Sequence, residues 1–386
     1  MRINKENDKN TAKKINIKKY LSDKSPIIGC VLMIIILIII PTGYEDALTF
    51  TTSDRAKVRV LSTDESSIVD TGLVRSGEQR CEVEILTGMF KGKTGTAVNR
   101  LSGSLESDKM FSKGDTALVT IDYEKEEILY INMIDHYRIN SEIILALVFI
   151  IFLILFAGKT GFRAVFSFVF TILCIWKILI PQCLNGVNPI FAGIVITVIL
   201  TIAIISLVYG FDKRTVAACA GSVLGVITAC ILGALFTDMF KIHGAVMSYS
   251  ESLLYSGYQH LNLTQIFMAS IFIGSSGAMM DLAVDITSAV YEVKANCPDI
   301  SRKKLIKSGM NVGKAAMGTM TTTLLLAYSG GYIALLMVFM AQGTPIIHIL
   351  NYKYVSAEII QTVVGSFGLV AVAPFTAVTS GIIFTR

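Results

Sequence analysis

The sequence predicts an α-helical polytopic membrane protein with eight or nine transmembrane helices and a small extracytoplasmic β-barrel-like domain inserted after the first helix. Of its 386 residues, 53% are apolar and 16% are charged, a more hydrophobic balance than that of an average soluble protein. Uncharged apolar runs long enough to cross a bilayer recur along most of the chain. Between the first two runs, from Thr42 to Glu142, short β-branched stretches replace them.

The chain begins with a basic segment at residues 1–26, which holds eight Lys and Arg residues against three acidic ones. An uncharged segment at 27–41 follows it. No small-residue cleavage pattern follows Pro41, and the basic segment is long for a secretory leader, so we expect an uncleaved transmembrane anchor. The positive-inside rule then places residues 1–26 in the cytoplasm and Thr42 onward outside.

Residues 42–141 are expected to form the extracytoplasmic β domain. Five stretches have alternating or β-branched patterns, at 57–61, 79–86, 95–99, 116–121 and 127–133. Because turn signals such as Lys113-Gly114-Asp115 separate them, we expect a small antiparallel barrel or sandwich, with an oligosaccharide-binding-type or SH3-like barrel favoured. The domain shows no catalytic constellation, and the lone His136 is expected to be structural.

Residues 142–386 are expected to form a multi-pass transmembrane domain. Its apolar segments lie at 143–157, 164–180, 189–209, 215–236, 266–290, 309–328, 332–350 and 359–384. With the anchor they make nine spans, but the helix breakers at 329–331 and 343–345 leave open a re-entrant segment, which would make eight. The loops expected inside carry nine Lys and Arg residues and those expected outside carry one, which agrees with a cytoplasmic N-terminus.

Two polar stripes interrupt these spans. The first recurs every three or four residues and therefore follows one side of a helix; it comprises Gly274, Gly277, Asp281, Asp285, Ser288 and Glu292. Asp281 and Asp285 are one turn apart, and two close carboxylates in an apolar medium need a basic partner, a cation or a proton. The nearest candidate partner is Lys314, which leads the second stripe with Asn311, Gly318 and Thr321.

Two interpretations of the stripes stay open. Charged side chains inside a bilayer are costly and mark pairs, pathways or sites, so the polar residues are candidates for an ion, proton or substrate pathway: Asp281, Asp285, Lys314, Asn311, Ser288 and Thr321. Alternatively, Lys314 snorkels to the interface and the two aspartates are hydrated from the cytoplasm, so that the group only fixes the helical hairpin.

Small residues at helical spacing predict close packing of the spans. These candidates are Gly221, Gly225, Gly274, Gly277, Gly309, Gly313 and Gly318. The seven cysteines form no CxxC pair and no Cys/His spacing suited to zinc, so we expect no metal site.

Several classes of function are disfavoured. HExxH, a Walker loop and GxSxG are all missing from the sequence. Gly274-Ser275-Ser276-Gly277 matches the short GxSG of rhomboid-type proteases, but four small residues arise easily by chance. We therefore expect no enzymatic activity and no cofactor. A net charge of +5 is too small to suggest nucleic-acid binding.

A family resemblance appears at the same spans. The stretch 277–289, followed by 308–314 and 317–320, resembles the YibE/F-like family of bacterial multi-pass membrane proteins, as do Leu324 to Tyr328 and Glu358 ahead of Val364-Gly365-Ser366. The resemblance implies an extracytoplasmic β module after an N-terminal anchor and a bacterial plasma membrane, but no substrate. The chain departs from the family pattern at Ala315, where members often have an acidic residue, and at Thr322, where they have Asn.

The leading functional hypothesis is transport of an ion or small solute, coupled to protons through Asp281 and Asp285. The alternative is a non-catalytic accessory or assembly protein whose outer β domain binds a partner or envelope polymer. Expected partners are the lipid bilayer, a small solute or ion, and a protein partner or second copy of the chain. For transport, the two aspartates should face an interior cavity.

Overall fold

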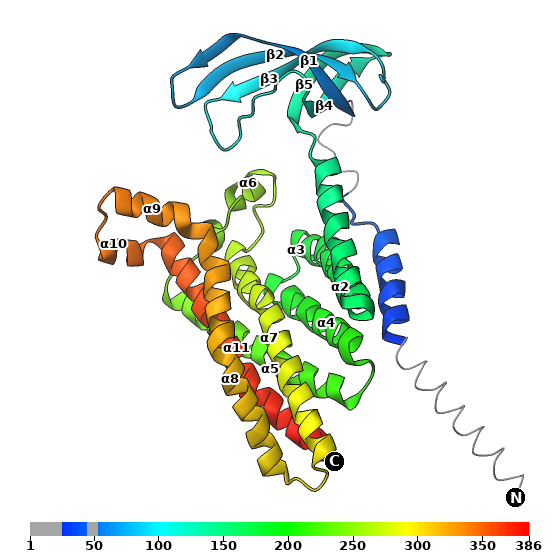
Figure 1. The fold of residues 1–386 in the computed structure, drawn as a ribbon. Coiled ribbons are helices and arrows are strands. Elements are labelled where there is room, and N and C mark those ends of the chain that lie inside the picture. The colour runs from blue at the N-terminus through cyan, green and yellow to red at the C-terminus, as the bar shows by residue number, and fades with distance from the viewer. Residues whose placement is uncertain (1–24, 45–52, 386) are drawn as a thin grey trace, which may run out of the picture. The chain divides into compact units, whose positions relative to one another are not determined.

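The computed structural model describes residues 25–44 and 53–385 (Figure 1). Nearly all of the expected basic tail therefore lies outside the described residues. The chain divides into two compact units, one of Glu45–Phe156 and the other of Met1–Tyr44 with Ala157–Arg386. The first unit contains a small β-barrel and the second is helical, which confirms the predicted fold class.

The barrel is built from five strands, β1 (Ser53–Asp70), β2 (Arg75–Ile85), β3 (Thr94–Ser102), β4 (Thr116–Glu124) and β5 (Glu127–His136). They close in the order β1-β2-β3-β5-β4, and β4 pairs with β1. All pairs are antiparallel except β3 with β5. This is the Greek-key order of an oligosaccharide-binding-type barrel.

Alternation along the strands produces the barrel core. On β1, Ala56, Val58 and Val60 point inward while Arg59 is exposed. Gln79 is an exception, because its polar side chain is fully buried. Its amide donates to the carbonyl oxygen of Phe111 at 2.8 Å and accepts from the Phe111 N–H at 3.0 Å, so it fastens the loop after β3 to the barrel.

The described residues contain fewer membrane-spanning helices than the nine expected. Six segments are long and apolar enough to cross a membrane: Ile139–Leu184, Pro189–Tyr209 (α4), Lys213–Met239 (α5), Leu263–Asn296 (α7), Arg302–Ala341 and Lys353–Ile383 (α11). A shorter apolar helix spans Ser25–Ile39. Two short elements, η2 (Gly244–Val246) and α6 (Ser250–Tyr255), lie between α5 and α7.

The first long segment combines α2 (Ile139–Cys174), the π-helical η1 (Ile175–Leu179) and α3 (Ile180–Leu184). Its axis breaks at Gly158, whose φ of 55° and ψ of −123° are not helical and favour glycine. The two spans expected at 143–157 and 164–180 thus meet at one residue instead of a loop.

The prediction of a membrane-spanning helix at 332–350 is wrong. This segment is divided between η3 (Gly330–Tyr332), α9 (Ile333–Ala341) and α10 (Ile346–Asn351), which follow α8 (Arg302–Ser329). A helix of nine residues is about 14 Å long, less than half of a bilayer core. Gly343 and Pro345 prevent the two short helices from merging. If α2–α3 crosses twice, around Gly158, this leaves the eight-span alternative for the described residues.

The helices α5, α7, α8 and α11 pack around an apolar core that includes Met279, Ile286 and Leu369. The Ser25–Ile39 helix packs instead on α4 and the second part of α2, through Ile34, Phe170 and neighbouring apolar side chains.

We name the two ends of the helical bundle after Arg214, at the start of α5, and Asn185, in the connection between α3 and α4. At the Arg214 end, Tyr291 contacts Phe384 with ring centroids 5.5 Å apart, and Arg302 donates to the Thr385 hydroxyl at 3.0 Å. At the Asn185 end, the Tyr44 hydroxyl donates to the Asn185 side chain at 2.8 Å.

Candidate functional site

The acidic stripe of α7 lies on the exposed side of that helix. Asp281 and Asp285 are exposed, whereas Met279, Ala283 and Ile286 on the other side are fully buried. Gly274, Gly277, Ser288 and Glu292 are exposed as well. The sequence therefore identified one side of a helix correctly, but none of the cavities described below is lined by either aspartate.

At the Arg214 end, Ser288 of the stripe belongs to a cluster whose other members, Tyr209, Arg214 and Tyr291, the sequence analysis did not include. The Tyr209 hydroxyl lies 2.6 Å from Ser288 Oγ and 2.5 Å from the carbonyl oxygen of Val284. Arg214 lies over the rings of Tyr209 and Tyr291, at 4.9 and 4.7 Å from their centroids. Tyr and Arg side chains at helix ends are typical of a membrane interface.

This cluster indicates the depth of the aspartates. Asp285 and Asp281 are three and seven residues from Ser288 toward the helix centre, which corresponds to about 5 and 10 Å. Asp281 therefore lies near the middle of α7, well inside the apolar zone that begins at the Tyr209 level.

The expected contact between Lys314 and the aspartates is not formed. No ion pair joins Lys314 to any carboxylate of the described chain. Gly313 faces the interior, against Ala373 and Ile286, and the next residue points about 100° away. Lys314 therefore shares a side of α8 with Thr321, toward α11, while the aspartates face outward from α7.

Five of the seven candidate packing glycines lie at close helix contacts. A Cβ atom would come within 3.0 Å of a neighbouring helix at Gly221, Gly225, Gly274, Gly309 and Gly313. Gly277 and Gly318 face open space instead, because they lie on the exposed sides that carry the polar stripes. Gly368, which the sequence analysis did not include, packs tightly against Met279, whose terminal methyl carbon would lie 2.2 Å from a Cβ atom added to the glycine.

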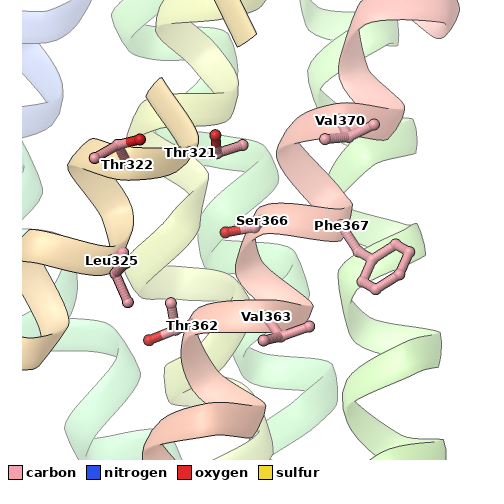
Figure 2. Close-up of a pocket in the computed structure, with 8 residues that line it drawn as sticks. All are labelled: Thr321, Thr322, Leu325, Thr362, Val363, Ser366, Phe367 and Val370. Carbon is pink, nitrogen blue, oxygen red and sulfur yellow. The ribbon is translucent and has the colours of Figure 1, made fainter. Parts of the chain in front are cut away.

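A groove between α8 and α11 brings together four hydroxyl side chains among apolar ones (Figure 2). Its volume is about 440 Å³, and it is lined by Thr321, Thr322, Leu325, Thr362, Val363, Ser366, Phe367 and Val370. Figure 2 shows the Thr362 and Ser366 hydroxyls directed toward α8, while Phe367 points away from it. Of the predicted pathway residues, Thr321 lines this groove and Asp281 and Asp285 do not.

The groove is mainly apolar, and most of its hydroxyl groups are left as hydrogen-bond acceptors. Thr321 and Thr322 donate their protons to the carbonyl oxygens of Met317 and Gly318, at 2.9 and 3.1 Å, so the lone pairs of their hydroxyls remain available. Pro374 lies inside α11 and has no N–H for the carbonyl four residues earlier, which belongs to Val370. The few polar atoms of the groove therefore favour a hydrogen-bond donor or a cation.

The barrel carries a separate pocket of about 340 Å³, between the β1–β2 turn and the loop after β3. Leu73 and Leu105 on its rim are 77% and 75% exposed. Asp108 holds the loop, because its carboxylate accepts from the backbone N–H groups of Ser102, Gly103 and Ser104. These bonds, led by that of Ser102, lower the pKa of Asp108 below its ordinary value.

Comparisons with known proteins cover both units. A model of the YibE/F-like protein family matches residues 145–386, and a model of the YibE/F family N-terminal domain matches residues 50–137. No curated protein and no solved structure matches the chain. Since the first model alone matches well over half of the sequence, the chain belongs to the YibE/F-like family.

Proposed function

We propose that the chain is a permease that moves an ion or small polar solute across the bacterial plasma membrane, along a path that includes the groove between α8 and α11. The observation that carries this proposal is the groove itself, whose four hydroxyl side chains lie within two apolar spans. Lipid offers no hydrogen-bond partners, so side chains of this kind support passage of a species that needs them. The proposal includes no enzymatic activity and no cofactor.

Two further features belong to the proposal. Asp281 and Asp285 face outward from α7 and line none of the described cavities, so they do not meet the cavity requirement within one copy of the chain. A coupling role for them therefore depends on a path that is completed along this exposed side of α7. The basic residues of the inner loops, such as Arg214 and Arg302, support a cytoplasmic Arg214 end and a barrel outside. A protein partner or second copy would cover the exposed side of α7.

The test uses the full chain in proteoliposomes that contain a trapped pH-sensitive dye, with imposed gradients of protons, Na⁺ or K⁺. We expect Thr322→Leu to remove most of the native flux by obstructing the groove. Thr323→Leu is the matched control, because Thr323 is also exposed and bonded to its own helix but does not line the groove.

We also expect Asp281→Asn and Asp285→Asn to abolish the dependence on the pH gradient. Equal flux in Thr322→Leu and Thr323→Leu would exclude the groove, and indifference to both aspartate changes would exclude the coupling role.

A second candidate function is supported by the barrel pocket. Exposed leucines beside a 340 Å³ pocket are typical of a binding surface, as an accessory protein would need. Deletion of residues 53–136 separates the two functions: flux that survives the deletion would count against an essential role of the barrel, while flux that disappears would support one.

A further inference from the structure

Glu358 is a carboxylate that neither polar stripe includes, and it lies at the end of the groove. The Thr362 hydroxyl, which lines the groove, donates to Glu358 Oε1 at 3.4 Å. The Tyr332 hydroxyl, at the junction of η3 and α9, also hydrogen-bonds the carboxylate. The side chain is partly buried, six residues into α11 at the Asn185 end of the bundle.

The surroundings of Glu358 contain hydroxyl groups, and no cation pairs with it. The titratable groups that face it are Tyr328 from α8 and Tyr332 from η3, and Tyr354 of α11 faces Tyr332. The helices α5 and α7 also pack on α11, but no Lys, Arg or His of the described residues forms an ion pair with Glu358. By contrast, Asp238 near the same end of the bundle is exposed and pairs with Lys241.

Tyr328 connects this site to the stripe of α7. A Cβ atom at Gly274 would lie 2.6 Å from the Tyr328 hydroxyl oxygen, so the glycine makes room for the tyrosine. The Tyr328 ring therefore lies between Gly274, at the Asn185 end of the stripe, and Glu358. The two polar surfaces of the bundle, separate near Lys314, come together at the Asn185 end.

We propose that Glu358 is a proton-binding site at the end of the groove, loaded from the Asn185 side. An ionised carboxylate in an apolar span with only hydroxyl partners loses most of its hydration, and a proton removes that cost. Both states fit the same contacts, because Thr362 and Tyr332 donate to the carboxylate and can accept from the carboxylic acid. The inference deepens the proposed function, but proton binding can be measured without transport.

The experiment is labelling with dicyclohexylcarbodiimide, a hydrophobic reagent that modifies protonated carboxyl groups in apolar surroundings. The full chain is reconstituted in phosphatidylethanolamine–phosphatidylglycerol vesicles, labelled between about pH 6 and about pH 9, and analysed by peptide mass spectrometry. We expect Glu358 to be labelled at the lower pH and at least about tenfold less at the higher. Glu251, on the exposed surface of α6, is the unlabelled control.

Three outcomes would overturn the proposal. The first is that Glu358 is not labelled at any pH, and the second is that its labelling does not change with pH. The third is that Na⁺ at constant ionic strength protects Glu358 from labelling, which would show a sodium site instead. Tyr332→Phe removes a donor to the ionised form, so we expect its labelling to persist to higher pH than in the native chain. Labelled Glu358 in a protein without flux would refute the permease and keep the proton site, and flux without labelling would do the reverse.

Discussion

Gln79 offers the sharpest test of how the barrel is held together. Its side chain is fully buried, exchanges two hydrogen bonds with the backbone of Phe111, and accepts from the Asn99 amide at 3.2 Å. The change Gln79→Leu keeps a side chain of similar size and removes all of these bonds. The loop that carries Phe111 and lines part of the barrel pocket then loses its anchor.

The expected cost follows from the partners left behind. Asn99 still donates to the Lys109 carbonyl at 2.6 Å, and Glu65, which accepts from the Gln79 amide at 3.3 Å, is exposed to water, so the loss at these two residues is small. The N–H and C=O of Phe111 are left without partners beside a buried ring, at about 1–3 kcal/mol each. Allowing for water that enters as the loop opens, we expect a total of about 3 kcal/mol. In a domain of this size that lowers the melting temperature by about 12 °C or more.

The assay is thermal and urea unfolding of a soluble fragment of residues 50–138, followed by far-UV circular dichroism. Thr96→Val is the control, because the bond from Thr96 to Glu82 is on the exposed surface and should contribute less than about 0.5 kcal/mol. A loss below about 1 kcal/mol for Gln79→Leu would refute the reasoning, since it would mean that water replaces the amide at no cost.

Three other predictions concern stability and reactivity. Gly368→Ala places a methyl group against Met279 and 2.8 Å from the Ala229 Cβ, which no rotamer change can move, and should cost about 1–3 kcal/mol, measured as a lower melting temperature in detergent. Gly277→Ala, which faces open space, should not lower it, and equal melting temperatures would contradict the packing. The pKa of Asp108 is lower in the folded than in the unfolded fragment, so the ionised carboxylate stabilises the folded state above about pH 4, and this contribution is lost as the pH falls through the folded pKa. In Asp108→Asn the free energy of unfolding of the fragment should therefore fall less on acidification than in the native fragment. Burial raises the pKa of the Cys81 thiol to about 11, so a maleimide should label exposed Cys297 and leave Cys81 unmodified until the barrel unfolds.

The β domain was predictable because its signals are local. Alternation such as that from Ala56 to Val60 requires a strand with one buried side, and the glycine-containing turns separate the strands. The extension of β1 to Asp70 was not foreseen, since Ser62 to Ser67 lack apolar alternation and pair with β2 as an exposed arm. The polar anchor Gln79 looked like an ordinary strand residue.

The candidate site was predictable only in part. Spacing placed Asp281 and Asp285 on one side of α7, but spacing cannot tell which neighbour a helix side faces, so the predicted contact between Lys314 and the aspartates is not formed. The groove depends on Thr362 and Ser366 of α11. They are about 40 residues from Thr322 in the sequence, and only the packing of α11 against α8 brings them close to it. Glu358 was noted in the sequence only as part of the family resemblance, because its hydroxyl partners come from segments that are distant in the chain or from the next helical turn.

The contacts at the two ends of the bundle have a practical consequence for locating the chain in a membrane. The Ser25–Ile39 helix ends where Lys177 donates to the Ile40 carbonyl, at the Asn185 end, and the chain finishes beside Arg302, at the Arg214 end. We therefore expect the start of the first helix and Thr385 to lie in the same compartment. Fluorescent or enzymatic reporters fused after Thr385 and ahead of Ser25 should give the same signal, and a reporter inserted in the loop at Gly257 should give the opposite one.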